Sequence, residues 1–335
     1  ELKEKFSIGF ALIGCGLMGD RHAQVLSSIA NARIVSAYDL DESRGKDFSE
    51  IYKCQFSSKI EDAINMEDVD AVLIASPSYL HAEQAMIAGR LGKHVLIEKP
   101  LATDIESCNS LIQFFEDRQL TLSVVSQKRY HPDVQSLKIA LEQDVLGDIF
   151  LFEISINYHR DDHYFKQAPW RSSGHESGGG VLMNQGIHYL DLLLWMLGPY
   201  KKISGFTKTV RPDYQEEDVA VGIIELINGT LGVMTASTVT YPNSPEQLSI
   251  YGTRGSCTIV EGKGIVGWSH KDEIKQPEFK NDLVIPNEIP SKLSSMYRNH
   301  LDFVESILHS KETKIPVRES MAVVEFVKDF YEISS

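Results

Sequence analysis

Residues 6–19 read Phe-Ser-Ile-Gly-Phe-Ala-Leu-Ile-Gly-Cys-Gly-Leu-Met-Gly, and this stretch decides the fold of the first part of the chain. The apolar run from Phe6 to Ile13 predicts a buried parallel strand, and a G-x-G-x-x-G pattern follows it directly. A helix is predicted over 20–28 and a second strand over 33–38, which ends at Asp39. The order of strand, glycine turn, helix, strand and acid predicts a unit that binds a dinucleotide.

The residues of this turn have a physical role in binding a pyrophosphate. Glycines let backbone N–H groups approach phosphates at the positive end of a helix. The expected cofactor contacts in the turn are Gly14, Gly16, Leu17, Met18 and Gly19. Asp39 is expected to accept the adenosine ribose hydroxyls and to repel a 2′-phosphate, which favours NAD over NADP, although Arg44 can soften that preference. A glycine turn in another kind of α/β domain is the alternative.

Strands and helices continue to alternate after Asp39. The sequence predicts strands over 69–75, 94–97 and 120–125, and helices over 80–91 and 105–117. Such alternation predicts an α/β Rossmann domain, a doubly wound parallel sheet with its ligand at the carboxyl ends of the strands. We expect this domain to occupy residues 1–125.

Two polar clusters follow strands of this predicted sheet. They supply further expected cofactor contacts, namely Ser76, Pro77, His81, Glu98 and Lys99. A lysine that leaves a buried strand toward the cofactor can stabilise a reacting oxygen. The alternative for Lys99 is an ordinary loop lysine, and the sequence leaves open whether the Lys99–Pro100 bond is cis.

Beyond about residue 126 the pattern changes to strands joined by short turns. The sequence predicts strands over 149–158, 202–210, 220–227, 230–239, 248–252 and 256–260, and final helices over 294–308 and 320–331. Asn228-Gly229 is a strong hairpin signal. We expect a second, α+β domain with a large, mostly antiparallel sheet over 126–335, in which the polar segment 271–290 is a mobile excursion.

Residues 177–191 join three consecutive glycines to the predicted start of a helix. A glycine run suits a tight turn or a close approach to a ligand. Asn184, His188 and Asp191 are spaced at i, i+4 and i+7, so they are expected to share one helix face. A neutral imidazole can remove a hydroxyl proton at neutral pH, which makes His188 the candidate acid/base. The alternative is a core histidine bonded to Asp191.

Composition limits the class of partner. A chain of 335 residues with 42% apolar and 24% charged residues is typical of a soluble protein of two domains. Its net charge of -14 argues against nucleic acid, because phosphate binding requires clustered Lys and Arg. Four scattered cysteines without a C-x-x-C pair, and no signal peptide or membrane-length apolar run, favour a cytoplasmic protein. The segment 159–163 is expected to be a polar loop and not a metal site.

Taken together, the motifs resemble the glucose–fructose oxidoreductase / inositol dehydrogenase (Gfo/Idh/MocA) family. The resemblance spans almost the whole chain and is carried by the glycine turn, Asp39, Ser76-Pro77 with His81, Glu98-Lys99-Pro100, Arg129-Tyr130-His131-Pro132, and Gly178-Gly179-Gly180 with His188 and Asp191. It implies an NAD(P)-dependent dehydrogenase of sugar hydroxyls, with His188 as acid/base and Lys99 stabilising the reacting oxygen. It also implies a sheet that carries the substrate on one side and pairs subunits through its open face, as a homo-dimer or homo-tetramer.

Within this family, residues 183–188 (Met-Asn-Gln-Gly-Ile-His), preceded by Pro169-Trp170-Arg171, resemble a subgroup that oxidises nucleotide-linked amino-sugar acids. UDP-N-acetylglucosaminuronate 3-dehydrogenase is its best-known type. The expected substrate contacts are Tyr130, Tyr158, Trp170, Arg171, Asn184 and His188. Arg171 can pair with a substrate carboxylate, whereas the aromatic residues can equally belong to the core. His131 and the residues after Arg171 depart from the pattern of the subgroup.

Asn184 leaves other functions open. Most members of the family have Asp at this position of the catalytic set, and Asn cannot take a proton. The alternatives are a dehydrogenase of a free polyol or monosaccharide such as inositol, and an NAD-binding regulatory protein that has lost its chemistry. We expect hydride transfer between NAD and a secondary hydroxyl of a sugar, a sugar acid or a nucleotide-linked sugar.

Overall fold

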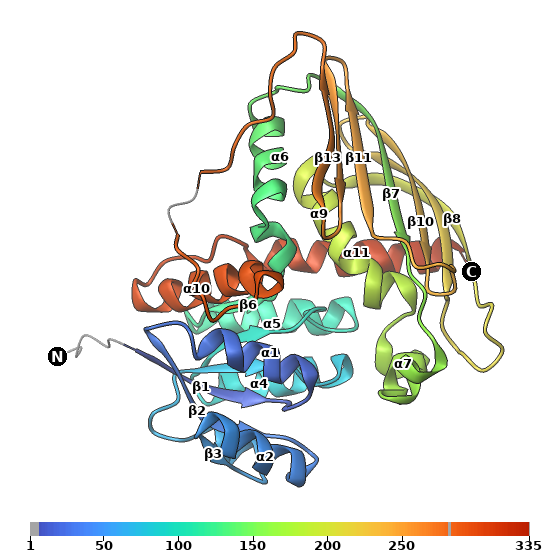
Figure 1. Ribbon diagram of the computed structural model, residues 1–335. Helices are drawn as coiled ribbons and strands as arrows, with labels where there is room; N and C mark the ends of the chain where they lie inside the picture. Colours follow the sequence, from blue (N-terminus) through green and yellow to red (C-terminus); the bar gives the residue numbers. More distant parts are fainter. Residues whose placement is uncertain (1–6, 281–282, 335) are drawn as a thin grey trace. The chain divides into compact units, whose positions relative to one another are not determined.

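The computed structural model describes residues 7–280 and 283–334, and the chain divides into two compact units (Figure 1). The first unit comprises residues 7–127 and 283–321, and the second comprises residues 128–280 and 322–334. Phe6, the first residue of the first predicted strand, lies outside the described residues.

A six-stranded parallel sheet forms the centre of the first unit. Its strands, in the order β3-β2-β1-β4-β5-β6, are β1 (Ile8–Ile13), β2 (Ala32–Tyr38), β3 (Gln55–Phe56), β4 (Ala71–Ile74), β5 (His94–Ile97) and β6 (Leu122–Val124). The order reverses between β1 and β4, the point at which doubly wound sheets bind their ligands. The predicted Rossmann architecture is therefore confirmed.

Apolar runs explain why these strands lie inside. Every residue of β1 and β4 is buried, as is typical of a parallel sheet covered on both faces. The covering helices are α1 (Leu17–Leu26), α2 (Glu42–Tyr52), α3 (Ile60–Ile64), η1 (Ser78–Leu80), α4 (His81–Arg90), α5 (Ile105–Asp117), η5 (Ser291–Leu293) and α10 (Ser294–Leu308). Helix α1 packs against α10, and α4 packs against α5.

Helix α10 belongs to the first unit, although the sequence analysis assigned all of 126–335 to the second domain. The cause is an apolar contact distant in sequence. The Phe303 ring of α10 lies 6.2 Å from the Phe10 ring of β1, and both side chains are fully buried. Met296 and Val304 join the same core cluster, which anchors α10 on the Rossmann sheet.

A seven-stranded sheet forms the second unit, in the order β13-β12-β11-β7-β10-β9-β8. Its strands are β7 (Ile149–Asn157), β8 (Tyr200–Lys208), β9 (Val219–Leu226), β10 (Leu231–Ser237), β11 (Gln247–Gly252), β12 (Gly255–Val260) and β13 (Gly264–His270). Among the described strand pairs of this second sheet, only β7 with β10 is parallel, so the prediction of a mostly antiparallel sheet is confirmed. The sequence analysis missed β13, whose two glycines and histidine weaken its strand pattern.

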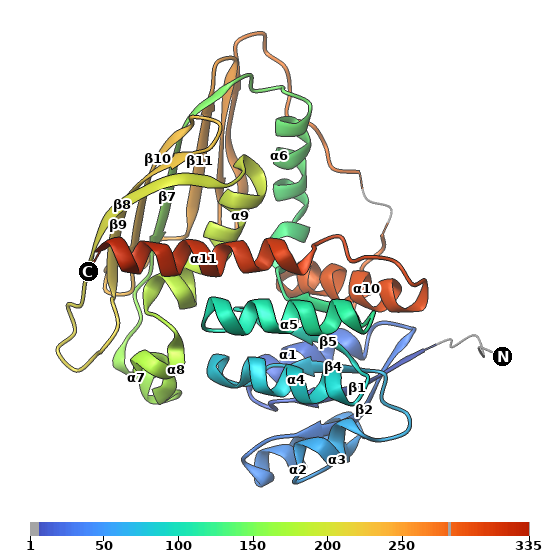
Figure 2. The same ribbon diagram turned by 180° about the vertical axis from the view of Figure 1, so that it is seen from behind.

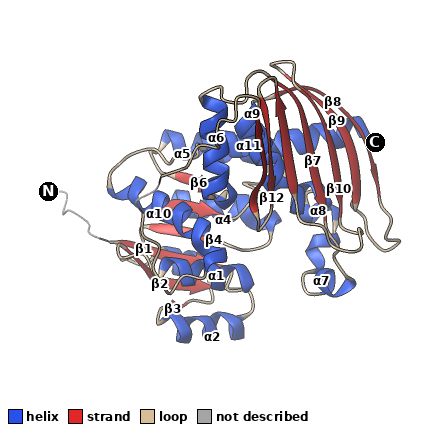
Figure 3. Cartoon of the chain, turned by 45° about the horizontal axis from the view of Figure 1, so that its top comes forward, coloured by secondary structure: helices blue, strands red, loops and turns tan. Residues whose placement is uncertain are grey.

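Helices α6, α9 and α11 pack against this sheet. The helices of the second unit are η2 (Gln127–Tyr130), α6 (Pro132–Glu142), α7 (Asp162–Lys166), η3 (Pro169–Ser172), α8 (Gly174–Ser177), the π-helix η4 (Leu182–Gly186), α9 (Ile187–Leu197) and most of α11 (Val317–Ser334). Figure 2 shows α9 and α11 along the sheet, and Figure 3 shows the strands of the sheet with these helices on one side. Phe330 of α11 packs where Gly205 and Gly222 leave room on β8 and β9.

The opposite face of the sheet carries exposed apolar side chains. Phe206 is 80% exposed and Ile223 is 62% exposed, while Val221 and Val233 are also exposed. Val221 pairs with Phe206 across the ladder, and Ile223 pairs with Val233, so these side chains form one continuous patch. Contiguous apolar surface of this kind marks interaction sites.

Candidate active site

The central strands of the first unit end at the same level. Ile13 pairs with Tyr38 on one side and with Ile74 on the other, and Ile74 pairs with Ile97. The next residue of each strand therefore lies at one edge of the sheet, and these residues are Gly14, Asp39, Ala75 and Glu98. This carboxyl edge is where a doubly wound sheet holds a dinucleotide.

The glycine turn has the space that a pyrophosphate requires. Gly14 has a φ of +94°, and a Cβ there would lie 2.8 Å from the backbone of Ala75 and Ser76. A Cβ on Gly19 would lie 2.0 Å from the carbonyl oxygen of Gly14, so this glycine permits close packing of α1 on β1. No atom lies within 4 Å of a Cβ on Gly16, the residue that precedes the first turn of α1. The open side of the turn therefore fits phosphate groups bound to backbone N–H groups.

Asp39 is held in place by the backbone around it. Its Oδ2 accepts a hydrogen bond from Cys15 N and its Oδ1 accepts one from Asp41 N, both at 2.8 Å. Arg44 Nη1 lies 3.7 Å from Asp39 Oδ2, and the Arg44 side chain is half exposed. A carboxylate has further lone pairs for ribose hydroxyls, so the arrangement fits the non-phosphorylated cofactor.

Replacing Asp39 with Ser should move cofactor preference toward NADP. The carboxylate that repels a 2′-phosphate is lost, while Arg44 stays to pair with that phosphate. We expect kcat/KM for NAD to fall about tenfold, which is roughly 1.4 kcal/mol, and kcat/KM for NADP to rise. Steady-state kinetics with both cofactors measure the ratio, with Asp41→Ser as the matched control. An unchanged ratio in Asp39→Ser would show that this acid does not select the cofactor.

The His81 ring lies between two backbone carbonyl groups at this edge of the sheet, and its contact with the cofactor stays a prediction. The imidazole is buried, with Nδ1 2.7 Å from the Pro100 carbonyl oxygen and Nε2 3.0 Å from that of Ser76. Burial lowers the pKa of His81, and the two carbonyl groups oppose that shift. The ring thus joins the loop after β4 to the loop after β5.

Glu98 is also buried, and its contact with the cofactor stays a prediction. Its Oε1 lies 2.9 Å from His22 Nε2, and its Oε2 accepts a hydrogen bond from Lys99 N at 3.1 Å. Lys99 itself is half-buried, directly after β5, and the Lys99–Pro100 peptide bond is cis. The carboxylate therefore holds the backbone of the residue that carries the candidate catalytic ammonium.

In the second unit, Asn184 and His188 are the two residues of 181–190 that are not fully buried. Residues Leu182–Gly186 form a π-helix that passes directly into α9, and such turns are frequent at functional sites. Asp191, unlike these two residues, is buried, so the three expected side chains are not equally accessible. Its carboxylate is buried and pairs with Arg129 through bonds of 2.8 and 2.6 Å.

Protein groups lie at close range to the glycine triplet. A Cβ on Gly179 would lie 2.3 Å from the hydroxyl of Tyr331, and one on Gly180 would lie 1.8 Å from the carbonyl oxygen of Glu217. The Glu217 carboxylate accepts hydrogen bonds from Gly180 N, Leu182 N and the Tyr331 hydroxyl at 2.8, 3.0 and 2.8 Å. Glu217 therefore joins this turn to the sheet and to α11.

Burial raises the pKa of Glu217 to about 7, against the opposing effect of these three hydrogen bonds. Its unfolded value is 4.5, so the folded state binds more protons than the unfolded state between pH 4.5 and about 7. The free energy of unfolding should therefore fall across this window, by roughly 3 kcal/mol from this group. In Glu217→Gln this fall in the free energy of unfolding with rising pH should vanish, as urea denaturation at several pH values would show. A pH dependence equal in wild type, Glu217→Gln and the exposed control Glu83→Gln would contradict the assignment.

Asn184 is matched to the glycine turn. Its Nδ2 donates to the carbonyl oxygens of Gly179 and Gly180, at 2.8 and 3.1 Å. An ionised Asp would place a carboxylate oxygen against those two carbonyl groups, where only a donor is favourable. The amide that departs from the usual family pattern is therefore the group that this turn requires.

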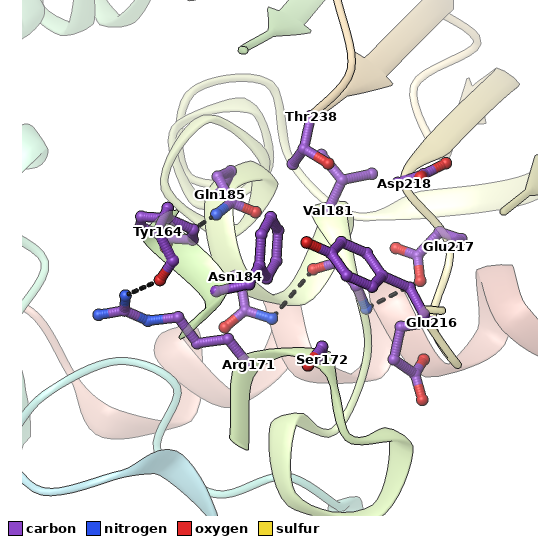
Figure 4. A pocket seen from close by; sticks show the side chains of 13 residues that line it. Tyr164, Arg171, Ser172, Val181, Asn184, Gln185, Glu216, Glu217, Asp218 and Thr238 are labelled. Carbon is purple, nitrogen blue, oxygen red and sulfur yellow. Dashed lines mark hydrogen bonds between the residues drawn. The ribbon is translucent and has the colours of Figure 1, made fainter. Parts of the chain in front are cut away.

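A small pocket lies beside this turn, lined entirely by residues of the second unit (Figure 4). Of the predicted substrate contacts, Arg171 and Asn184 line it. Arg171 Nη1 donates to the Tyr164 carbonyl oxygen at 3.1 Å, and its guanidinium lies 4.3 Å from the centre of the Tyr164 ring. Gln185 Nε2 donates to the Tyr164 hydroxyl at 3.1 Å. The pocket thus combines an aromatic wall and the Arg171 guanidinium with the acidic side chains of Glu216, Glu217 and Asp218.

The remaining predicted substrate contacts differ in accessibility. Tyr130 is only 7% exposed and lies in the core, whereas Tyr158 and Trp170 are half-buried. Arg160 was missed by the sequence analysis because a single arginine in a polar loop forms no motif. Its guanidinium lies 4.4 Å from the Tyr158 ring centre and 5.1 Å from that of Tyr164, and its buried Nε has no hydrogen-bond partner in the structure. The signal available in the sequence was its place two residues after Tyr158.

Within residues 7–280 and 283–334, no group of three or more His, Cys, Asp and Glu side chains is arranged to hold a metal ion. In the polar loop, His163 Nε2 lies 2.8 Å from Gln167 Nε2. No helix in the described part of the chain has the length and apolarity needed to cross a bilayer.

Comparison with known proteins places the chain among oxidoreductases. Residues 8–126 match the model of an oxidoreductase family with an NAD-binding Rossmann fold, and residues 134–258 match the GFO/IDH/MocA C-terminal domain. Inositol 2-dehydrogenase 2 of Saccharopolyspora erythraea is 28% identical over 234 residues, which are 67% of this chain and 65% of that protein.

Solved structures share the fold of this chain over nearly its full length. The WlbA dehydrogenase from Chromobacterium violaceum, crystallised with NADH and UDP-GlcNAcA, is 26% identical with a TM-score of 0.84, covering 98% of this chain and 94% of its own. The WlbA dehydrogenase from Bordetella pertussis shares the fold at 24% identity and a TM-score of 0.87, with coverage of 98% and 96%. The chain belongs to the GFO/IDH/MocA family of NAD-dependent oxidoreductases.

Proposed function

We propose that this protein oxidises a secondary hydroxyl of a nucleotide-linked sugar acid and passes the hydride to NAD. The observation that carries the proposal is the pocket beside the His188 helix, in which Arg171 lies over the Tyr164 ring next to Asn184. The WlbA dehydrogenase that is 26% identical was crystallised with NADH and UDP-GlcNAcA, a ligand of this class. Residues 169–171 and 183–188, which resemble the subgroup that oxidises nucleotide-linked amino-sugar acids, support the same substrate class.

Each of the chain's own residues has a defined task in this reaction. The turn from Gly14 to Gly19 and the carboxylate of Asp39 hold the cofactor by its pyrophosphate and its ribose. NAD, when bound, supplies the acceptor for the hydride that leaves the carbon atom. His188 takes the hydroxyl proton as the C–O bond becomes a carbonyl, and the Lys99 ammonium stabilises the oxygen while it carries negative charge. The reverse reaction uses the same groups, with His188 returning the proton.

The substrate anion is assigned to the arginines of the second unit. Arg171 offers a planar set of donors that matches a carboxylate. Its Nη1 donates to the Tyr164 carbonyl oxygen. Arg160 lies over the same Tyr164 ring and adds positive charge to this wall. Glu216, Glu217 and Asp218 also line the pocket, so we place the substrate carboxylate at its Arg171 side.

A comparison of three substrates tests this proposal. NADH absorbance is followed with UDP-N-acetylglucosaminuronate, with UDP-N-acetylglucosamine, which lacks the carboxylate, and with myo-inositol. We expect kcat/KM to be highest for the acid, and we expect Arg171→Gln to reduce it at least tenfold for the acid while leaving the neutral nucleotide sugar nearly unchanged. Preferential turnover of myo-inositol would replace the proposal with a polyol dehydrogenase, a function suggested by the 28% identical inositol 2-dehydrogenase. NAD binding without turnover of any of the three would favour a regulatory protein.

The open face of the seven-stranded sheet is proposed as the contact between two copies of this chain. Phe206, Val221, Ile223 and Val233 form its apolar patch. Phe206→Glu should turn a homo-dimer or homo-tetramer into smaller species, because a charge would have to be buried at the contact. Light scattering after size-exclusion chromatography measures the mass, and Ile51→Glu on the exposed surface of α2 is the control. A wild-type monomer, or an assembly unaffected by Phe206→Glu, would refute this interface.

A further inference from the structure

Three buried titratable side chains form a continuous chain inside the first unit. Glu98 Oε1 lies 2.9 Å from His22 Nε2, His22 Nδ1 lies 2.8 Å from His300 Nε2, and His300 Nδ1 lies 2.8 Å from the carbonyl oxygen of Met296. Both imidazoles are 0% exposed and Glu98 is 7% exposed. The two ring planes lie within 23° of each other, as expected for rings that share a hydrogen bond in their plane.

The number of protons in this chain follows from its geometry. A carbonyl oxygen can only accept, so His300 Nδ1 must donate to Met296. Each of the three contacts needs one proton, because a contact between two bare lone pairs in the interior would be repulsive. Two neutral imidazoles beside an ionised Glu98 carry only two protons. The three contacts therefore require a third proton, which gives the assembly a net charge of zero.

The surroundings determine where that proton lies. Burial raises the pKa of Glu98, but the hydrogen bond and charge of His22 outweigh this effect and hold that pKa below its usual value. Burial, followed by the charge of His22, lowers the pKa of His300 well below its usual value. Glu98 is therefore the anion and His300 is neutral, so the third proton lies on His22. Lys99 and His81 are the other titratable groups that act on Glu98 or its loop.

We propose that Glu98, His22 and His300 form a buried, overall neutral positioning triad that holds the backbone of Lys99. His22 lies in α1, the helix that begins at the glycine turn, and His300 lies in α10. Glu98 uses its second oxygen to accept the Lys99 N–H. The triad thus links the loop that carries Lys99 to α1 and to α10. Its catalytic consequence rests on the proposed role of Lys99, whereas its proton count and its hold on the Lys99 backbone do not.

The proton count is measured on the wild-type protein labelled with ¹⁵N-histidine, by NMR at pH 7. We expect His22 to be protonated on both ring nitrogens and His300 on Nδ1 alone. In His300→Gln the amide oxygen can still accept from His22, so the doubly protonated His22 should persist. In His300→Phe that acceptor is gone and His22 should become singly protonated. A wild-type His22 with one ring proton beside an ionised Glu98 would overturn the proposal, as would identical His22 spectra in the Gln and Phe variants.

The positioning role is measured by hydrogen exchange of two neighbouring amides. The Lys99 amide donates to the Glu98 side chain, whereas the Glu98 amide donates to the backbone carbonyl of Ile74 at 2.8 Å and serves as an internal reference. His22→Phe should speed exchange at Lys99 at least tenfold relative to Glu98. Phe303→Leu, which disturbs the same core without touching the triad, should leave that ratio unchanged. An unchanged ratio in His22→Phe would overturn the positioning role, and NADH fluorescence titration verifies that each variant is folded.

Discussion

His188→Asn should lower kcat by about a thousandfold, within the range of 10²–10⁴ that a positioned general base contributes. Asn is close to His in size and can form hydrogen bonds, but it cannot take a proton at neutral pH. His188 and Asn184 are the residues of 181–190 that reach the surface, so the substitution changes an accessible group and leaves the buried face of α9 intact. NADH affinity should stay within a few-fold of wild type, because the cofactor residues lie in the first unit.

Steady-state kinetics with the nucleotide-linked sugar acid and a fluorescence titration with NADH separate these two effects. His309→Asn, at an exposed position after α10, is the matched control and should retain wild-type kcat. A kcat within threefold of wild type for His188→Asn would remove His188 from the chemistry. Equal loss of NADH binding and turnover would instead indicate a structural defect.

Lys99→Met should lower kcat by a factor on the order of 10²–10³, the usual effect of removing one donor that stabilises a developing oxyanion. Met keeps the apolar stem of the lysine and removes only the ammonium group. The Glu98 carboxylate accepts from the backbone N–H of residue 99, and that bond does not depend on the side chain. The loop should therefore keep its position, and KM should change less than kcat.

The comparison of Lys99→Met with Lys99→Arg tests the electrostatic part of this prediction. Arg keeps the positive charge in a different geometry, so it should recover part of kcat. Lys292→Met, on the exposed surface of η5, is the control. If the Arg and Met variants lose the same activity, charge is not what Lys99 contributes. If Lys99 and His188 act in the same chemical step, Lys99→Met should lower kcat by a much smaller factor in the His188→Asn background than in the wild type.

The Rossmann unit could be predicted because its information is local. The strand before Gly14, the glycine turn and Asp39 all lie within residues 8–39, and the observed sheet aligns Gly14 and Asp39 at one edge. The antiparallel sheet followed from alternating strands and short turns in the same way. What local patterns omit is the partner of each buried polar group. Asp191 pairs with Arg129, which is 62 residues away, and helical spacing alone could not indicate this pairing.

In the candidate site, too, local sequence patterns did not reveal which residues contact one another. The glycine triplet predicted a close approach, but its partners Tyr331 and Glu217 lie on distant elements that no spacing rule connects. The assignment of α10 to the first unit depends on Phe303 meeting Phe10, a contact across almost the whole chain. Asn184 was an unexplained departure from a family pattern until its amide was seen to donate to two carbonyl groups of the turn. The residue types were readable from the sequence, while their partners required the fold.

A single-turnover experiment tests the central claim most directly. The NAD complex of the enzyme, in excess, is mixed with UDP-N-acetylglucosaminuronate, and NADH absorbance is recorded for wild type and for His188→Asn. We expect stoichiometric NADH formation in the wild type and a rate about a thousandfold lower in the variant. Equal rates in the two proteins, or no NADH from the wild type, would contradict oxidation of a nucleotide-linked sugar acid with His188 as its base.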